Sequence, residues 1–232
     1  MNTWSRFFDN QKKIWLFITL VLTAILATVL FSKFLLWNES RLGRVFNDPI
    51  LGRFQPVNLS LWIGLLTNGA IFIAMISLLK RPATTVYLLS AVLVMCIIRG
   101  LSLYFVVLEP PVNIIPLKDP ILDMTFYGGQ VILKDLFFSG HTANIILVGL
   151  LSENLWTKRI ILLLGAIVGS MLVLQHVHYS IDVLAAPVFA IITYKLSIKL
   201  GNFLMLKHME AGKRCGRIVY ELGLSPDTKP IK

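Results

Sequence analysis

The sequence predicts an all-α fold, an integral membrane bundle of six transmembrane helices. Hydrophobic residues make up 56% of the 232 positions and charged residues only 15%, a composition too apolar for a soluble domain. The apolar residues also gather in runs that polar stretches separate. A bilayer core about 30 Å thick requires roughly 20 apolar residues per helical span, and six runs come near that length.

The six runs follow one another along the chain, and each is expected to form one helix. The first follows Lys12 and Lys13 and could be mistaken for a secretory signal, but it is long and no small-x-small cleavage site stands out at its end. The last three are short, which leaves their boundaries open. The expected spans are Ile14 to Phe31, Leu61 to Leu79, Thr85 to Leu108, Thr142 to Trp156, Ile160 to Leu174 and Ser180 to Leu196.

Two connections between the runs are rich in helix breakers. The first, Asn38 to Pro56, mixes charges with glycine and proline, and the second, Glu109 to Phe138, carries four prolines and a Gly-Gly pair. No internal repeat or soluble domain is apparent. We therefore expect one six-span transmembrane domain over residues 1–200 and a short basic cytoplasmic tail over residues 201–232. Gly165 and Gly169, spaced as small-x-x-x-small, are expected to allow close helix packing.

The formal net charge of +10 does not indicate a nucleic-acid partner, because the basic residues flank hydrophobic spans instead of forming one solvent-facing domain. Topology signals and attraction to anionic lipid headgroups account for them better. With both termini on one side, that side collects 15 of the Lys and Arg residues and the other side six, which predicts cytoplasmic termini. Cys96 and Cys215 lie in settings too different for a disulfide, and no Cys-based metal site is implied.

Polar clusters stand at the beginnings of the fourth and sixth runs. Ser139-Gly140-His141-Thr142 opens the fourth, and a stretch with His178 and Asp182 opens the sixth. Even-numbered spans of a six-span bundle all run in the same direction, so these two beginnings emerge at the same membrane face. His141 and His178 are therefore expected to share a face, whatever the absolute orientation of the chain.

His178 and Asp182 are four residues apart, which places them on one side of a helix about one turn from each other. A carboxylate that accepts a hydrogen bond from one ring nitrogen fixes the tautomer and leaves the other nitrogen free to attack. This spacing makes His178 a candidate nucleophile. His176, two residues earlier, would point elsewhere on a helix, although an irregular entry could bring it near.

The cluster at the start of the fourth run is suited to an anion. Ser139 is well placed as an N-cap, Gly140 lets a ligand approach the backbone, and Thr142 adds a hydroxyl. Unpaired N–H groups and the positive end of the helix dipole favour a phosphate there. His141 could then protonate a leaving oxygen and later activate an attacking hydroxyl. Two such histidines and Asp182 suit phosphoryl transfer without a metal ion, and neither a metal nor another cofactor is predicted.

The two clusters resemble the type 2 phosphatidic acid phosphatase (PAP2) superfamily, and within it they are most similar to the sphingomyelin synthase branch. The block D-x-x-x-S-G-H-T appears as Asp135-Leu-Phe-Phe-Ser139-Gly140-His141-Thr142, and the block H-Y-[ST]-x-D-V as His178-Tyr179-Ser180-Ile181-Asp182-Val183. The resemblance implies that His178 is the nucleophile, Asp182 its orienting partner and His141 the second catalytic imidazole, at the non-cytoplasmic face. It covers mainly Ile97 to Pro187.

Other residues of the resembling segments are candidates for substrate binding. These are Ser139, Gly140, Thr142, Asp135, Arg99 and Tyr179. Arg99 falls in register with a family arginine that precedes a proline-containing turn, and either a phosphate or a carboxylate could be its partner, since an arginine in a span must be compensated. Asp135 has two open roles, a place in the site or a hydrogen bond in the loop.

The sequence departs from the phosphatases of the superfamily in two blocks. They carry K-x6-R-P and an arginine ahead of the nucleophilic histidine, whereas Lys80-Arg81-Pro82 lacks that spacing and Leu172 occupies the arginine position. The missing phosphate clamp favours the synthase-like branch. It also leaves the charge of the transferred phosphate without compensating residues that the sequence identifies.

Three functions follow as hypotheses. The leading one is a lipid phosphotransferase that moves a phosphorylated headgroup from a phospholipid through a phosphohistidine to the hydroxyl of a lipid such as ceramide or diacylglycerol. The second is a PAP2-type lipid phosphate phosphatase with water as acceptor. The third is a non-enzymatic transporter or scaffold. The partners are the donor and acceptor lipids and the bilayer of a plasma, inner or Golgi-like membrane, while the oligomeric state stays open.

Overall fold

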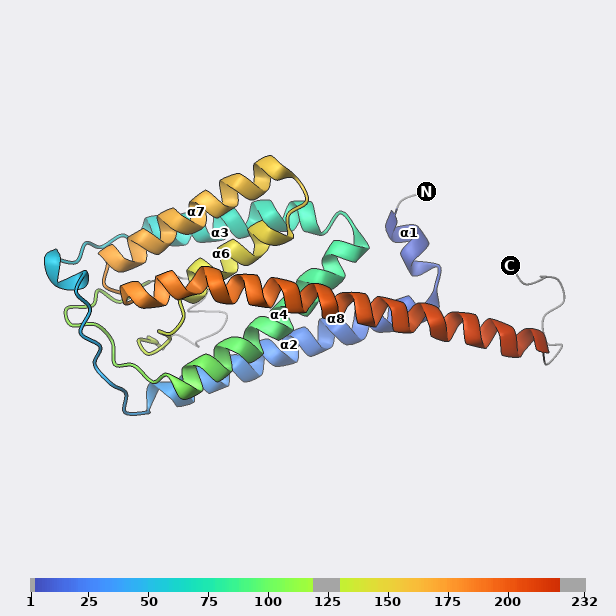
Figure 1. The fold of residues 1–232 in the computed structure, drawn as a ribbon, viewed down its shortest axis with the longest axis horizontal. Coiled ribbons are helices and arrows are strands. Elements are labelled where there is room, and N and C mark those ends of the chain that lie inside the picture. The colour runs from blue at the N-terminus through green and yellow to red at the C-terminus, as the bar shows by residue number, and fades with distance from the viewer. Residues whose placement is uncertain (1–2, 119–129, 222–232) are drawn as a thin grey trace.

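The structure is a computed structural model that describes residues 3–118 and 130–221, and the regular secondary structure of these residues is helical (Figure 1). Among them the one extended pairing is an isolated parallel bridge between Arg44 and Leu108. The all-α prediction is confirmed for this part of the chain. The helices are α1 (Thr3–Phe8), α2 (Gln11–Glu39), η1 (Leu51–Arg53), α3 (Ser60–Leu78), α4 (Pro82–Phe105), α6 (Gly140–Leu151), α7 (Leu155–Leu174) and α8 (Ser180–Glu221).

Local sequence signals account for where several of these helices begin. Asn10 caps α2 by accepting a hydrogen bond from Lys12 N–H, and Asn154 caps α7 through the N–H groups of Trp156 and Thr157. Pro82 occupies the first turn of α4, where its missing N–H costs no helical hydrogen bond. These caps define helix starts that hydropathy alone leaves uncertain.

Among the described residues, five helices are long and apolar enough to cross a membrane: α2, α3, α4, α7 and the Ser180–Met205 part of α8. The chain is an integral membrane protein. The fourth expected span differs, because α6 has only 12 residues, a length of about 18 Å. It ends at Leu151, and Trp156, which was expected in the same run, already belongs to α7.

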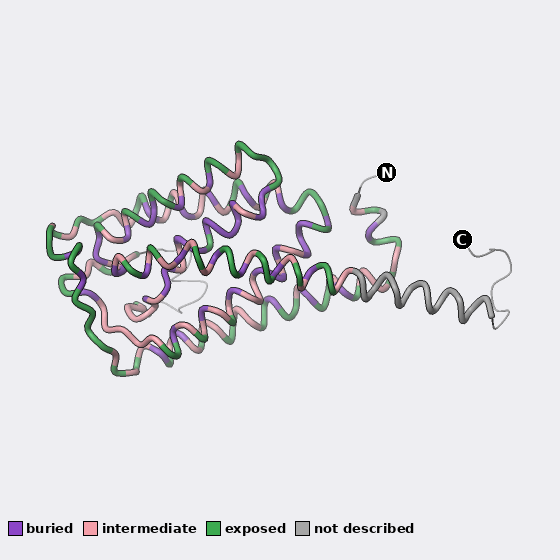
Figure 2. The backbone as a smooth tube through the Cα atoms, viewed as in Figure 1, coloured by how far each residue is buried: buried purple, intermediate pink, exposed green. Residues whose placement is uncertain are grey.

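The short helix α6 lies inside the protein. It packs against α7, α8 and α3, and Figure 1 shows it between the α3–α7 pair and α8. Ala143 and Ile145 are fully buried, whereas Leu22 of α2 and Phe72 of α3 are more than half exposed and face outward. Figure 2 shows the same alternation of buried and exposed positions along the long helices. Protein rather than lipid therefore surrounds α6, which permits its short length.

Small residues allow the helices around α6 to approach closely, as the sequence predicts. A side chain at Gly165 would lie 3.1 Å from Ile146 Cγ1, and one at Gly169 would lie 2.7 Å from Val183 Cγ1. Gly169 also faces Thr142 of α6 at 3.3 Å. Because of Gly169, α7 brings the first turns of α6 and α8 together.

The last helix continues past residue 200, after which the basic tail was expected to begin. α8 continues through Gly201 to Glu221, and Gly201 lies against the ring of Tyr87 in α4, at 2.6 Å from the position of an added Cβ. Helix packing thus extends beyond residue 200.

The connections at the start of α6 and α8 form a network that ties separate segments together. Arg44 N–H donates to Val107 O at 2.9 Å, and Glu109 N–H donates to Arg44 O at 3.0 Å. Lys134 Nζ donates to Glu109 Oε1 at 2.9 Å, and Lys134 N–H donates to Glu39 Oε2 at 2.9 Å. The loops over this end of the bundle are consequently held by specific contacts.

Candidate active site

The two polar clusters of the sequence meet in the structure. Ser139 N–H, at the start of α6, donates a hydrogen bond to the backbone carbonyl of Asp182 in the first turn of α8, at 3.1 Å. Thr142 and Val183 both lie against Gly169 of α7. The beginnings of α6 and α8 are therefore in direct contact, at one end of the bundle.

His178 and Asp182 face each other at this end. His178 Nδ1 lies 3.5 Å from Asp182 Oδ2, and the two side chains are 3% and 0% exposed. Asp182 Oδ2 also accepts a hydrogen bond from Tyr179 N–H at 3.0 Å. The contact is long for a hydrogen bond, as such contacts often are before substrate binds. Because Nδ1 faces the carboxylate of Asp182, Nε2 points away from that carboxylate.

The pairing does not arise from two positions within one helix, as the sequence pattern suggested. α8 begins at Ser180, so His178 lies in the turn that enters the helix and Asp182 in its first turn. Asp182 N–H donates to Tyr179 O at 3.1 Å and closes that turn. The turn folds His178 back over the helix start, which brings the imidazole to the carboxylate.

The first turn of α6 carries the other cluster. Ser139 is the N-cap residue, but its side chain caps no backbone N–H and instead donates to Thr142 Oγ1 at 3.1 Å. Both side chains are buried, while His141 and Gly140 are half-buried. The N-terminal end of α6 thus keeps its positive dipole end uncovered by a capping side chain.

Arg99 of α4 reaches this helix start. Its guanidinium donates to Phe138 O at 2.7 Å and pairs with Asp135, and the side chain is 4% exposed. It also lies directly against Gly140, because an added Cβ there would be 2.6 Å from Arg99 Cζ. Of the two partners considered for Arg99, the structure shows the carboxylate, Asp135. The same contact places a buried cation beside the first residue of α6.

The side chain of Tyr179 points toward the loops that carry Phe46 and Glu109. Its side chain is 2% exposed, its hydroxyl donates to Glu109 O at 3.0 Å, and it accepts from Phe46 N–H at 3.4 Å. Burial, together with the charges of Asp182, Asp48 and Glu109, raises the pKa of Tyr179 although the Phe46 N–H opposes the shift. Its hydroxyl is therefore engaged with the loops.

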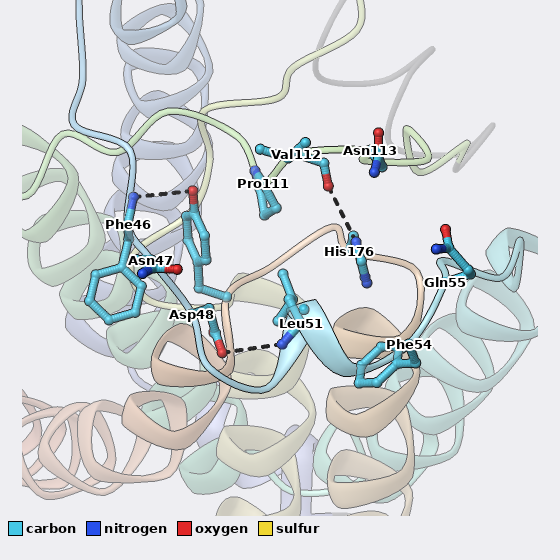
Figure 3. A pocket seen from close by; sticks show the side chains of 12 residues that line it. Phe46, Asn47, Asp48, Leu51, Phe54, Gln55, Pro111, Val112, Asn113 and His176 are labelled. Atoms are coloured by element: carbon cyan, nitrogen blue, oxygen red, sulfur yellow. Dashed lines mark hydrogen bonds between the residues drawn. The ribbon is translucent and has the colours of Figure 1, made fainter.

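A pocket of about 290 Å³ lies beside Tyr179, under the loops (Figure 3). Phe46, Leu51, Phe54 and Val112 supply apolar surface. His141, His178 and Asp182 do not line this pocket.

His176 belongs to the pocket and not to the histidine pair. Its backbone has a positive φ of 58°, a value uncommon for a residue other than glycine. Its Nδ1 lies 3.3 Å from Val112 O, and its ring contacts Phe54 edge-on (Figure 3). The irregular entry to α8 thus turns His176 away from His178.

Two residues at this end were missed by sequence reasoning. Asp48 accepts hydrogen bonds from the N–H and the hydroxyl of Ser180, at 2.6 and 2.7 Å. Gln175 is fully buried and joins three segments through Leu59 N–H, Ser60 Oγ and Ile115 O. Asp48 stands in an Asn-Asp-Pro triplet typical of turns, but no sequence pattern identifies its partner 132 residues away.

Residues 134–199 match the family model described as PAP2 superfamily C-terminal. The matched segment holds both clusters and the hydrogen bond between Ser139 and Asp182. Over this segment the chain is similar to the PAP2 superfamily. Members of the superfamily are phosphatases and phosphotransferases that act on phosphate esters, so the PAP2 segment identifies the protein as an enzyme of this class. No curated protein and no solved structure shows a significant match to the chain.

The PAP2 segment contains no obvious metal centre. Within residues 3–118 and 130–205, no group of three or more His, Cys, Asp and Glu side chains could hold a metal ion. At this end of the bundle the side chains available for chemistry are His141, His178 and Asp182 of the matched segment and the ion pair between Asp135 and Arg99, which lies outside that segment.

Proposed function

We propose that the protein is a membrane lipid phosphotransferase, similar to the sphingomyelin synthase branch, that moves a phosphorylated headgroup from a phospholipid to a lipid hydroxyl. The observation that carries this proposal is the contact between the starts of α6 and α8, through Ser139 N–H and Asp182 O. That contact puts the segments bearing His141 and His178 at one end of the bundle. Each segment then supplies one imidazole.

In the first half of the reaction, His178 Nε2 attacks the phosphorus of the donor. The N–P bond forms while the P–O bond to the donor lipid breaks, and His141 gives a proton to the leaving oxygen. Asp182 holds the His178 ring through Nδ1 and stabilises the positive charge that develops on it. The product of this half is a phosphohistidine and a lipid alcohol.

In the second half, the hydroxyl of a ceramide or diacylglycerol gives its proton to His141, and its oxygen attacks the phosphorus. The N–P bond breaks and His178 is restored. The buried Arg99 and the N-terminal end of α6 lie together and provide positive potential for the phosphate oxygens. Arg99 in this role would fill part of the gap left by the missing phosphatase arginines.

The proposal includes a topology in which six helices cross the membrane, with α6 as the short, enclosed one. Both termini then face the cytoplasm, the reaction takes place at the non-cytoplasmic face of a plasma, inner or Golgi-like membrane, and residues 1–200 form the catalytic domain. Support for this orientation comes from the distribution of Lys and Arg along the sequence.

A substitution at His178 tests the catalytic assignment. His178→Ala should lower headgroup turnover by about 10⁴-fold or more, because it removes the nucleophile, at unchanged expression and melting temperature. His176→Asn is the matched control, since Asn tolerates the positive φ, and it should retain turnover within about threefold of the wild type. Turnover that survives in His178→Ala would exclude the phosphohistidine route.

The acceptor decides between the two enzymatic functions. Purified protein is supplied with a phospholipid labelled in its headgroup, with ceramide, with diacylglycerol, or with neither. A labelled new lipid that requires the added acceptor indicates transfer. Release of a soluble labelled phosphate species at the same rate with and without acceptor would instead identify a phosphatase.

A further inference from the structure

Asp48 stands close to the proposed nucleophile, although it is 130 residues away in the sequence. It lies in the loop between α2 and α3 and is 7% exposed. Its Oδ2 accepts from Ser180 N–H at 2.6 Å and from Ser180 Oγ–H at 2.7 Å. Its Oδ1 accepts from Ile50 N–H at 2.8 Å and from Leu51 N–H at 3.4 Å, so both carboxylate oxygens are fully used.

The start of α8 needs such a partner. The residue before the helix is Tyr179, whose side chain has no acceptor that can fold back onto the first backbone N–H groups, and its hydroxyl donates to Glu109 O. Asp182 reaches back to Tyr179 N–H, but Ser180 N–H is left over. Asp48 supplies the missing cap from a distant segment, and its charge also suits the positive end of the helix.

Pro187 increases the dependence of the first turn on this cap. It lies inside α8 and has no N–H to donate to the carbonyl of Val183, four residues earlier. The turn that carries Asp182 therefore lacks one of the helical hydrogen bonds that would hold it from the C-terminal side.

Asp48 itself is held in place and kept charged. Burial works to raise the pKa of Asp48, but the hydrogen bonds from Ser180, Ile50 and Leu51 together hold it below the usual range. In Figure 3 its carboxylate points toward the 3₁₀ turn of its own loop, with the bond to Leu51 drawn. A fixed, ionised carboxylate is thus available at the start of α8 at neutral pH.

From these contacts we infer that Asp48 is a positioning residue for the His178–Asp182 pair, an inference that rests on the proposed function. Asp48 fixes Ser180, which lies between the two members of the pair. Asp182 in turn touches both Tyr179 N–H and His178 Nδ1. Without the cap, the first turn of α8 frays and the imidazole loses its alignment with the phosphorus. Asp48 acts through Ser180, so its loss should lower turnover more than it weakens substrate binding.

The experiment compares variants of the full-length protein in the headgroup-turnover assay. In Asp48→Ala, kcat should fall roughly 10- to 100-fold, the loss expected from misplacing a reacting group by about 1 Å, while KM stays within about threefold. Asp48→Asn keeps one carbonyl oxygen for Ser180 N–H and should lie between Asp48→Ala and wild type. Ser180→Ala keeps the backbone hydrogen bond and should lose the least.

Asn154→Ala is the matched control. It also removes a helix cap, from α7, but at the other end of the bundle, where α6 ends and α7 starts (Figure 1). It should lower stability by a similar amount and leave kcat per folded molecule within about threefold of wild type.

Three outcomes would overturn the inference. The first is a kcat of Asp48→Ala equal to that of Asn154→Ala, and the second is a raised KM with unchanged kcat in Asp48→Ala. If Asp48→Ala does not fold, the third is a wild-type kcat in both Asp48→Asn and Ser180→Ala. Failure of the proposed function gives a different result, because either the wild type itself would show no headgroup turnover or turnover would persist in His178→Ala.

Discussion

Gly140 is the residue whose missing side chain matters most to the candidate site. Any Cβ at this position would overlap the guanidinium of Arg99, which is itself held by Phe138 O and Asp135. The glycine was expected from the sequence to admit a ligand to the backbone. In the structure the group that approaches is an arginine of another helix.

We predict that Gly140→Ala displaces Arg99 and lowers turnover by roughly tenfold or more, since a cation beside the proposed phosphate site is moved. Gly100→Ala is the control, because Gly100 is the neighbour of Arg99 in α4 and an added Cβ there meets nothing within 4 Å. That variant should keep wild-type turnover. Equal activity of both variants in the headgroup assay would mean that the position of Arg99 is irrelevant to the reaction.

The residues of the site differ in how far the sequence could predict them. The pairing of His178 with Asp182 was predicted from their spacing in one helix, whereas in the structure the turn before α8 brings the two side chains together. The Arg99–Asp135 pair joins α4 to a loop 36 residues later, and only tertiary structure distinguishes this carboxylate from a phosphate as the partner. The contact of Asp48 with Ser180 was not predictable, because the two residues are 132 positions apart and neither the turn triplet around Asp48 nor the block that contains Ser180 indicates the other.

At the level of secondary-structure elements, the loops over the site are held by Glu109. It accepts from Gly43 N–H at 2.7 Å and from Lys134 Nζ at 2.9 Å. These two contacts hold the pKa of Glu109 below its usual value despite an opposing effect of burial. A carboxyl whose pKa is lowered by folding stabilises the fold above its unfolded pKa, and that stabilisation is lost as pH falls.

We predict that Glu109→Gln lowers the free energy of unfolding by about 1 kcal/mol at pH 7. The difference from wild type should shrink as the pH falls below 4.5, the ordinary pKa of this carboxyl, because the unfolded chain then binds a proton at Glu109 before the folded protein does. Thermal unfolding in detergent at pH 7 and pH 4 measures this. A difference that grows on acidification would contradict the assigned contacts.

The boundary between α6 and α7 shows that hydropathy alone does not predict where one helix ends and the next begins. The apolar run from Thr142 to Trp156 was expected as one span, but α6 ends at Leu151 and Trp156 lies in α7. Because the residues on both sides of the short turn are apolar, hydropathy does not distinguish the end of one helix from the start of the next. Asn154 carried the missing signal, since it is a favoured N-cap residue and does cap α7.

For the whole molecule, the feature that composition could not predict is the environment of α6. Composition alone predicted a membrane bundle, and the five long apolar helices agree with it. The enclosure of α6 by α3, α7 and α8 could not be read from the sequence, because burial by protein and burial by lipid both require apolar residues.

We predict that the connections on the two sides of α6 face opposite sides of the membrane. Single cysteines are placed at Leu42 and Val131, both well exposed, and at Glu153, in a protein lacking Cys96 and Cys215. A membrane-impermeant maleimide should label the first two from one side and Glu153→Cys only from the other. Labelling of all three from one side would show that α6 does not cross.

The helix α8 is 42 residues long, about 63 Å, whereas the hydrocarbon layer is about 30 Å thick. Its first turn carries Asp182, and the same rod continues without a break to Glu221. In the proposed topology the helix is therefore about 33 Å longer than the hydrocarbon layer is thick. A spectroscopic label on this excess length would register the tilt of the helix that bears the carboxylate.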